Sequence, residues 1–184
     1  MSLTDLFIGT DFFNRLGRRN IRGDELADMI GATRASAQLG GPYPLGTSGG
    51  PYPTGSVLID FSPPAGGGIN FDDGGFIDFS KNVAGFVIPD GVTRFQCTIV
   101  GRWFPQVAST TQVGFKISYP SVAADIARAE WVASSDPNGT SGSLTSPVVE
   151  INPAGAQHVV FQTVVRGASG VQTLSECWAS ITAH

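Results

Sequence analysis

The sequence predicts an all-β protein, a jelly-roll β-sandwich of about eight strands, on three observations. The 24 glycines and 12 prolines make up about a fifth of the 184 residues, which suits many tight turns. The hydrophobic fraction of 41% is nevertheless too high for a disordered chain. From residue 55 onward, apolar and polar side chains alternate in short runs, which is the period of a half-buried strand.

The clearest strand is expected over residues 92–104, where one face is apolar and the other is polar. The apolar face carries Phe95, Cys97, Ile99 and Trp103. The polar face carries Arg94, Gln96, Thr98 and Arg102. Further strands are expected over residues 113–119, 126–133, 146–151, 158–167 and 171–184, with a turn at 136–139. In the strand over 126–133, Arg128 and Glu130 should share a side.

Residues 1–39 are predicted to form a helical N-terminal anchoring segment. Ser2 to Asp5 has the spacing of a capping box, and a second short helix is expected over residues 24–30. Helices this short are not stable alone in water, so they need a surface to pack on. The apolar residues that would anchor the segment are Leu6, Phe7, Phe12, Phe13 and Leu16.

Residues 40–54 are predicted to be a Gly/Pro-rich linker, which leaves residues 55–184 as the β-sandwich domain. The pentapeptide Gly-Gly-Pro-Tyr-Pro occurs at 40–44 and again at 49–53. Proline favours extended geometry, and paired glycines permit changes of direction, so the stretch is typical of a tether with stiff parts. Tyr43 and Tyr52 are candidates for exposed or interface aromatic residues.

The chain contains few charged residues, which favours an oligomer. Charged residues make up 14% of the chain, against roughly 25% in a typical soluble domain. Much of the surface is therefore expected to be covered by sister copies. The net charge of −4 and the lack of a basic patch with interleaved aromatics argue against nucleic-acid binding. No signal peptide and no membrane-spanning run are expected, which predicts assembly in a cytoplasm.

The sequence offers no constellation for catalysis, and we expect neither an enzyme nor a cofactor. It lacks a phosphate loop, a dinucleotide fingerprint and a nucleophile elbow, and its only histidines are His158 and His184. Cys97 and Cys177 are expected to be buried free thiols, although a disulfide stays open.

Two further sites are left open by the sequence. Asp72 and Asp73 fit a polar turn better than a calcium site, because calcium prefers six or more oxygen ligands. Trp178 lies opposite Cys177 and Ala179 in the last strand, so it should face either a subunit contact or an exposed sheet.

The stretch from Gly85 to Cys97, GFVIPDGVTRFQC, resembles a pattern of jelly rolls of the complement globular-head and tumour-necrosis-factor type. In that pattern a glycine-aromatic strand ends at a proline, turns through a glycine and enters a strand with an inward aromatic. Residues 158–184 look like the ending of the same family, whose last strand runs to the C-terminus near a trimer axis. The resemblance covers about residues 55–184 and implies a homotrimer.

Similar domains occur in bacteriophage fibres and capsid accessory proteins, and the combination with a helical segment and a tether resembles a virion surface protein. The expected function is therefore a capsid-attached decoration, head spike or short fibre. Such a protein would be located in the virion, bind capsid or other virion proteins through residues 1–39, and take part in host adsorption. Two alternatives stay open: a tail-fibre module that recognises a host surface polysaccharide, and a cement protein that stabilises the capsid.

Overall fold

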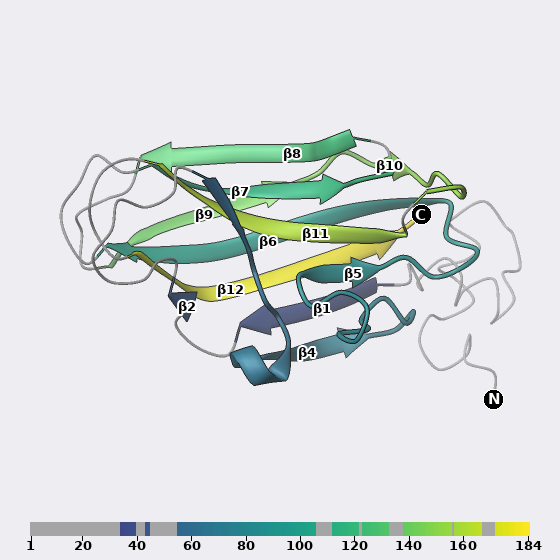
Figure 1. Cartoon of the computed structure of the whole chain (residues 1–184), viewed down its shortest axis with the longest axis horizontal. Helices are drawn as coiled ribbons and strands as arrows, with labels where there is room; N and C mark the ends of the chain where they lie inside the picture. The colour runs from purple at the N-terminus through teal and green to yellow at the C-terminus, as the bar shows by residue number, and fades with distance from the viewer. Residues whose placement is uncertain are drawn as a thin grey trace, which may run out of the picture. The chain divides into compact units, whose positions relative to one another are not determined.

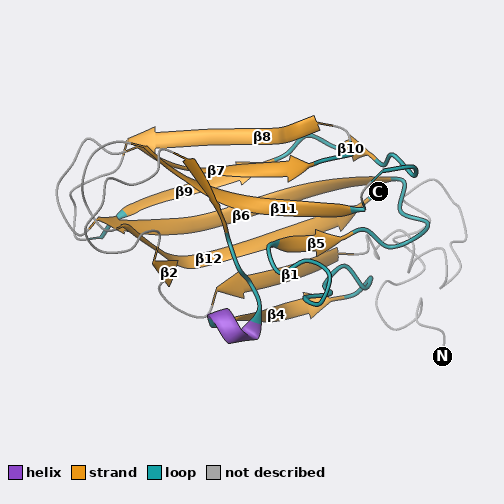
Figure 2. Cartoon of the chain, viewed as in Figure 1, coloured by secondary structure: helices purple, strands orange, loops and turns teal. Residues whose placement is uncertain are grey.

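The computed structural model describes residues 34–39, 43–44, 55–105, 112–121, 123–132, 138–155, 157–166 and 172–184. These residues form two antiparallel sheets that face each other across one core (Figure 1). Figure 2 shows that strands dominate; within the described ranges the only helical element is a short 3-10 turn, Pro63–Ala65. The all-β sandwich predicted from the sequence is confirmed. None of the helical structure in the described ranges is long and apolar enough to cross a membrane.

Sheet A is the larger sheet, with the strand order β10-β6-β12-β1-β4. Two further strands pair outside this path, β9 with β6 and β2 with β12. Its strands are β1 (Arg34–Leu39), β2 (Tyr43–Pro44), β4 (Gly67–Asp72), β6 (Arg94–Pro105), β9 (Thr140–Thr145), β10 (Val149–Glu150) and β12 (Gln172–Ala183).

Sheet B has the order β3-β11-β7-β8, and β5 also pairs with β11. Its strands are β3 (Gly55–Leu58), β5 (Gly85–Val87), β7 (Gln112–Tyr119), β8 (Ala123–Val132) and β11 (His158–Arg166). The strands predicted over 92–104, 113–119, 126–133, 158–167 and 171–184 correspond to β6, β7, β8, β11 and β12.

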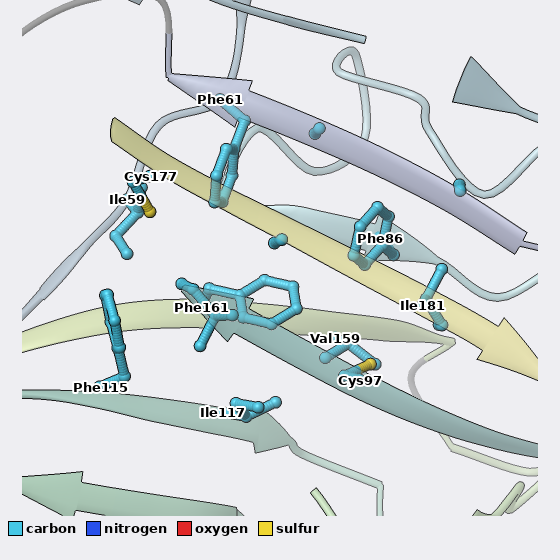
Figure 3. Packing of buried hydrophobic residues seen from close by; sticks show 14 of the residues in the cluster. Ile59, Phe61, Phe86, Cys97, Phe115, Ile117, Val159, Phe161, Cys177 and Ile181 are labelled. Carbon is cyan, nitrogen blue, oxygen red and sulfur yellow. The ribbon is translucent and has the colours of Figure 1, made fainter. Parts of the chain in front are cut away.

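The core lies between the inward faces of the two sheets (Figure 3). The four apolar residues predicted on one face of β6 are all completely buried, as strict alternation requires. Aromatic rings meet edge to face in the core, with Phe161 of β11 in contact with both Phe61 and Phe86. Such pairs prefer this geometry because the edge of one ring is positive and the face of the other is negative.

One buried hydrogen bond joins the two sheets through the core. The indole Nε1 of Trp103 on β6 donates to the hydroxyl Oγ1 of Thr163 on β11, at 2.9 Å. The same hydroxyl donates to the backbone oxygen of Gly114 on β7, at 3.2 Å. Trp103 is thus satisfied in an apolar surrounding, where an unpaired N–H would be costly.

The tetrapeptide Ile-Asp-Phe-Ser occurs twice, at 59–62 and 77–80, and folds in the same way each time. The serine amide and hydroxyl both donate to the aspartate, at 2.9 and 2.6 Å for Asp60 and at 3.1 and 2.5 Å for Asp78. Aspartate and serine favour such local turns over regular strands. The Ser80 hydroxyl and Lys81 hold the pKa of Asp78 below its usual range.

The prediction of a helical segment over residues 1–39 is wrong for the last six of these residues. Arg34–Leu39 form β1, which pairs with β12 on one side and β4 on the other. Ala35, Ala37 and Leu39 are buried and alternate with polar residues, so this part of the predicted helical segment has the period of a strand. The compact β unit runs from Arg34 to His184 rather than from residue 55.

The predicted linker also contributes to the sheet at one point. Tyr43 and Pro44 form β2 and pair with Leu174 and Thr173 of β12. The helical prediction for residues 1–33 and the rest of the linker lie outside the described residues.

Candidate functional site

Trp178 is the large aromatic residue on the outward side of β12. Its side chain is 45% exposed, whereas its neighbours Cys177 and Ala179 are buried. The prediction that Trp178 faces away from these two residues is confirmed. Exposed tryptophan within a central strand is uncommon, because the side chain has a large apolar area to bury.

A β-bulge determines the direction of Trp178. Ser175 pairs with Arg102 of β6 and Trp178 pairs with Val100. Between these two pairs the chain advances by three residues in β12 and by two in β6, so β12 has one extra residue. Strict alternation from the buried Leu174 would turn Trp178 inward; the extra residue reverses this and turns it outward. The bulge therefore places an indole on the surface that would otherwise have entered the core.

Glu176 lies in the bulge and has the unusual backbone conformation there. Its φ of 49° lies in the left-handed region, and no other non-glycine residue of the described ranges has a positive φ. This conformation costs roughly 1–2 kcal/mol for a residue with a side chain. The carboxylate Oε2 of Glu176 lies 3.2 Å from Nη1 of Arg102, an ion pair that ties the bulge to β6.

A shallow hollow of about 450 Å³ lies beside Trp178, between β12, β1 and β4. Most of its lining is apolar, and among the polar side chains in it Asn70 Nδ2 donates to Ser36 Oγ at 3.2 Å. The residues around the hollow are Ser36, Gln38, Leu39, Asn70, Glu176, Cys177 and Trp178.

The surface around Trp178 is uncharged over several strands. Cross-strand partners share a face, so the pairing of the strands gives the rows of side chains. One row runs Ser143, Val100, Trp178, Gln38, and the next runs Thr145, Thr98, Ser180, Ser36, Phe71. We call these nine residues the sheet A outer face.

The charges near the sheet A outer face are neutralised within the chain. Arg102 pairs with Glu176 on one side of the two rows. Arg34 approaches Asp73 at 3.8 Å on the other side, and its guanidinium lies 5.6 Å from the ring centre of Phe71. No unpaired charge lies within the two rows.

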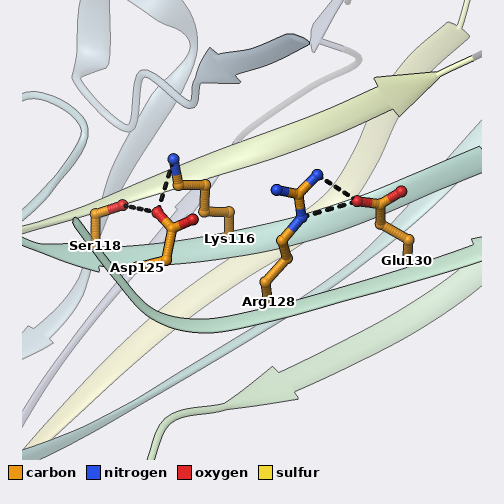
Figure 4. Close-up of polar contacts among 5 residues, drawn as sticks. All are labelled: Lys116, Ser118, Asp125, Arg128 and Glu130. Atoms are coloured by element: carbon orange, nitrogen blue, oxygen red, sulfur yellow. Dashed lines mark hydrogen bonds and ion pairs between the residues drawn. The ribbon is translucent and has the colours of Figure 1, made fainter. Parts of the chain in front are cut away.

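The outer side of sheet B is different, because charged residues occupy it (Figure 4). Lys116 Nζ lies 2.7 Å from Asp125 Oδ1, which also accepts a hydrogen bond from Ser118. Arg128 Nε donates to Glu130 Oε1 at 2.8 Å, so the prediction that these two residues share a side of β8 is confirmed. Both outer sides thus carry ion pairs, and those of sheet A lie on either side of the uncharged rows rather than within them.

The two cysteines are structural. Both are free and buried in the core, as predicted. Burial raises the pKa of both thiols, because the charged thiolate is disfavoured away from water. A thiol that stays protonated is a poor nucleophile and a poor metal ligand.

Asp72 and Asp73 form a polar turn. The two oxygens of Asp72 accept the backbone amides of Phe76 and Ile77, each at 2.9 Å, and Asp73 faces Arg34. Both carboxylate oxygens of Asp72 thus accept hydrogen bonds from backbone amides of the turn, which agrees with the interpretation as a polar turn. Within the described ranges, no group of three or more His, Cys, Asp or Glu side chains comes together.

The other predicted site residues lie outside what the structure describes. This applies to the anchoring residues Leu6, Phe7, Phe12, Phe13 and Leu16, to Tyr52 and to the side chain of Tyr43. The sequence analysis missed the hollow and the bulge. A signal for the bulge was present, since Leu174 and Cys177 are three residues apart where alternation requires an even spacing.

No protein-family model and no curated protein matches the sequence. Among solved structures, the chain is similar to one titled "PRD1 vertex protein P5", with a TM-score of 0.53. The similarity covers 83% of this chain and 95% of that chain, at 19% sequence identity. The likeness is one of fold, and it extends over most of both chains.

Proposed function

We propose that this chain is a structural protein of a phage virion surface and not an enzyme. The observation that carries the proposal is the shared fold with a PRD1 vertex protein across 95% of that protein's chain. The sequence analysis also arrived at the virion class, from the combination of a helical segment, a tether and a jelly-roll resemblance over residues 55–184. Fold alone does not determine function, so the surface chemistry has to agree.

The surface chemistry agrees with a role in assembly. The described part of the chain has an apolar core, ion pairs on the outer side of sheet B, and uncharged rows between two ion pairs on sheet A. An uncharged patch with a central aromatic residue is typical of a protein interface. We propose that sister copies cover this patch and that the assembly is a trimer.

We propose that the segment before β1 attaches this trimer to the capsid or another virion protein. Arg34 pairs with Thr182, so β1 begins at the end of the sandwich where β12 ends. We propose that the opposite end of the sandwich is displayed toward the host. Three anchors on one trimer raise each other's effective concentration, so weak docking by Leu6, Phe7, Phe12, Phe13 and Leu16 becomes durable.

Two truncations test the attachment. A chain of residues 34–184 keeps β1 and should fold, but should no longer cosediment with particles that lack the native protein. A chain of residues 40–184 loses β1 from between β12 and β4, and should fail to fold by circular dichroism. The full-length chain should bind the same particles saturably, and binding by residues 34–184 at the full-length level would contradict the anchoring role.

A second candidate function is recognition of a host surface glycan. The hollow beside Trp178 favours it, because an aromatic face next to the amides of Gln38 and Asn70 suits a sugar ring. Saturable binding of the full-length protein to one polysaccharide on a glycan array would support this function. A lack of binding across the array would count against glycan recognition and leave the structural role as the one proposed function.

A further inference from the structure

We propose that Asn138 and Gly139 form a site of spontaneous modification, at which the side-chain amide of Asn138 is converted to a carboxylate in the folded protein. The conversion gives the chain an additional negative charge and, in part of the molecules, an additional carbon atom in the main chain. Water is the co-reactant, and ammonia is the product that leaves. This chemistry is independent of the proposed virion role, and only its consequence for the displayed end of the sandwich rests on that role.

The position of the site in the chain exposes the two groups that react. The dipeptide Asn-Gly occurs once in the sequence, at 138–139. It lies in the turn before β9, where Asn138 is exposed to solvent. Gly139 has a φ of 76°, a left-handed conformation that costs glycine nothing. Because glycine has no side chain to shield its backbone nitrogen, the carboxamide that precedes it can approach this nitrogen closely.

The other asparagines of the described ranges are each protected by a local feature. Asn82 is buried, and its side-chain amide takes part in three hydrogen bonds with the backbone. Asn152 precedes Pro153, whose nitrogen carries no hydrogen and cannot attack. Asn70 donates to Ser36 and is followed by a bulky side chain. Within these ranges, Asn138 is therefore the one asparagine that is both exposed and followed by glycine.

The reaction proceeds in two balanced steps. In the first step, the backbone nitrogen of Gly139 attacks Cγ of Asn138 and closes a five-membered imide ring. The bond from Cγ to the side-chain nitrogen breaks, and ammonia leaves with the proton that the Gly139 nitrogen gives up. In the second step, water adds to one of the two imide carbonyls and reopens the ring.

The direction of ring opening decides which product forms. If the new bond between Cγ and the nitrogen breaks, the product is ordinary aspartate. If the original peptide bond breaks, the product is isoaspartate, in which the main chain passes through Cβ and Cγ. Both products carry a carboxyl group that is ionised at neutral pH, so both add a negative charge where the amide was neutral.

Isoaspartate at this position displaces the start of β9. The backbone at Gly139 already lies close against β6, because a Cβ atom built there would be 2.3 Å from the backbone oxygen of Trp103. Thr140, the next residue, pairs with Trp103 in the ladder between β9 and β6. An additional main-chain atom so close to this pair shifts Thr140 from its partner. Thr145, at the far end of β9, is too distant along the strand to be affected.

The new charge appears at the end of the sandwich opposite to Arg34. β9 begins opposite Trp103, near the end of β6. Arg34 is aligned through β12 with Gln96, near the start of β6. The end that carries Asn138 is thus the one that we expect to be displayed toward the host, and the modification makes this end more acidic as the protein ages.

Ageing of the purified full-length chain tests the inference. The protein is kept in a mildly alkaline buffer, because base removes the proton from the attacking nitrogen, and isoelectric focusing follows the appearance of a more acidic band. Peptide mapping by mass spectrometry locates the change, and electron-transfer fragmentation distinguishes aspartate from isoaspartate. Asn138→Ser and Asn138→Gln are the unreactive variants, since serine has no amide and glutamine closes its larger ring slowly. Asn70→Ser is the matched control, because Asn70 is an exposed asparagine that no glycine follows.

The wild type and Asn70→Ser should form the acidic band at the same rate, with both aspartate and isoaspartate at position 138. Asn138→Ser and Asn138→Gln should lose the band, and circular dichroism checks that each variant folds. The aged wild type, separated by ion exchange, should show faster hydrogen exchange than the fresh protein at the start of β9 and the same exchange at its end.

Three results would count against the inference. If the Asn138 amide stays intact in the folded chain while the same chain in urea is converted, the fold blocks the attack and the site does not exist. If both Asn138 variants still form the acidic band, the modification belongs to another residue. If protein that contains isoaspartate exchanges like fresh protein along β9, the displacement of this strand is wrong. The attachment and self-association proposals are measured separately, by cosedimentation and by mass.

Discussion

Thr163 is the residue through which the two sheets share a polar contact inside the core. Its hydroxyl accepts from Trp103 of sheet A and donates to the backbone of Gly114 in sheet B. The side chain is completely buried, so neither partner can turn to water if the hydroxyl is lost. One oxygen atom therefore fixes the rotamer of the largest core side chain and the spacing of β11 from β6.

We expect Thr163→Val to lower the free energy of unfolding by about 1–3 kcal/mol, because it keeps the volume but leaves a buried indole N–H unpaired. Thr93→Val is the matched control, since the Thr93 hydroxyl donates to the backbone oxygen of His184 at the exposed surface. That variant should stay within about 0.5 kcal/mol of the wild type. Urea denaturation with an unchanged m-value measures both, and equal effects would contradict the role of Thr163.

At the residue scale, the sequence predicts which side chains enter the core better than it predicts their polar partners. Period-two alternation placed Phe95, Cys97, Ile99 and Trp103 inside correctly. The bond from Trp103 to Thr163 joins residues 60 positions apart, so no local pattern could show it. The same holds for the hollow, whose lining comes from three strands distant in sequence.

Among the elements, the alternation of apolar and polar residues predicted β12 correctly but did not lead to the prediction of β1. β12 was expected over residues 171–184, and the outward side of Trp178 was correct. β1 was missed because short alanine and serine residues fit a helix as easily as a strand, and its neighbours in the sequence suggested a helical segment. Only its pairing with β12 and β4 decides its structure, which is a tertiary effect.

The packing of β8 against β9 depends on a glycine. A Cβ atom built on Gly142 of β9 would lie 2.8 Å from the ring of Trp131 on β8, which is closer than such atoms approach. Trp131 in turn packs against Trp103 and Phe115. A side chain at position 142 would therefore displace the aromatic cluster at the point where the edges of the two sheets meet.

We expect Gly142→Ala to destabilise the protein by about 1–3 kcal/mol through overpacking. Gly68 of β4 offers the matched control, because nothing lies within 4 Å of a Cβ built there. Gly68→Ala should change stability by less than about 0.5 kcal/mol. Thermal unfolding followed by near-ultraviolet circular dichroism distinguishes the two, and a neutral Gly142→Ala would show that Trp131 has room to move.

For the whole molecule, the sequence predicted the sandwich because the evidence for it is spread over many strands, so that errors in a few elements do not change the class. The boundary of the β unit was less predictable, because it depends on which strand completes sheet A. Self-association was inferred from the low content of charged residues, 14%. The structure adds the location of an uncharged surface, the rows around Trp178 on sheet A. The charged pairs on the outer side of sheet B contrast with the uncharged rows around Trp178.

The mass of the full-length protein in solution at micromolar concentration tests the central claim most directly, and native mass spectrometry or sedimentation equilibrium measures it. The account predicts a single assembly of three chains, three times the 19.2 kDa of one copy, because the uncharged face of sheet A requires a partner. A monodisperse species of 19.2 kDa that stays soluble with Trp178 exposed would contradict it.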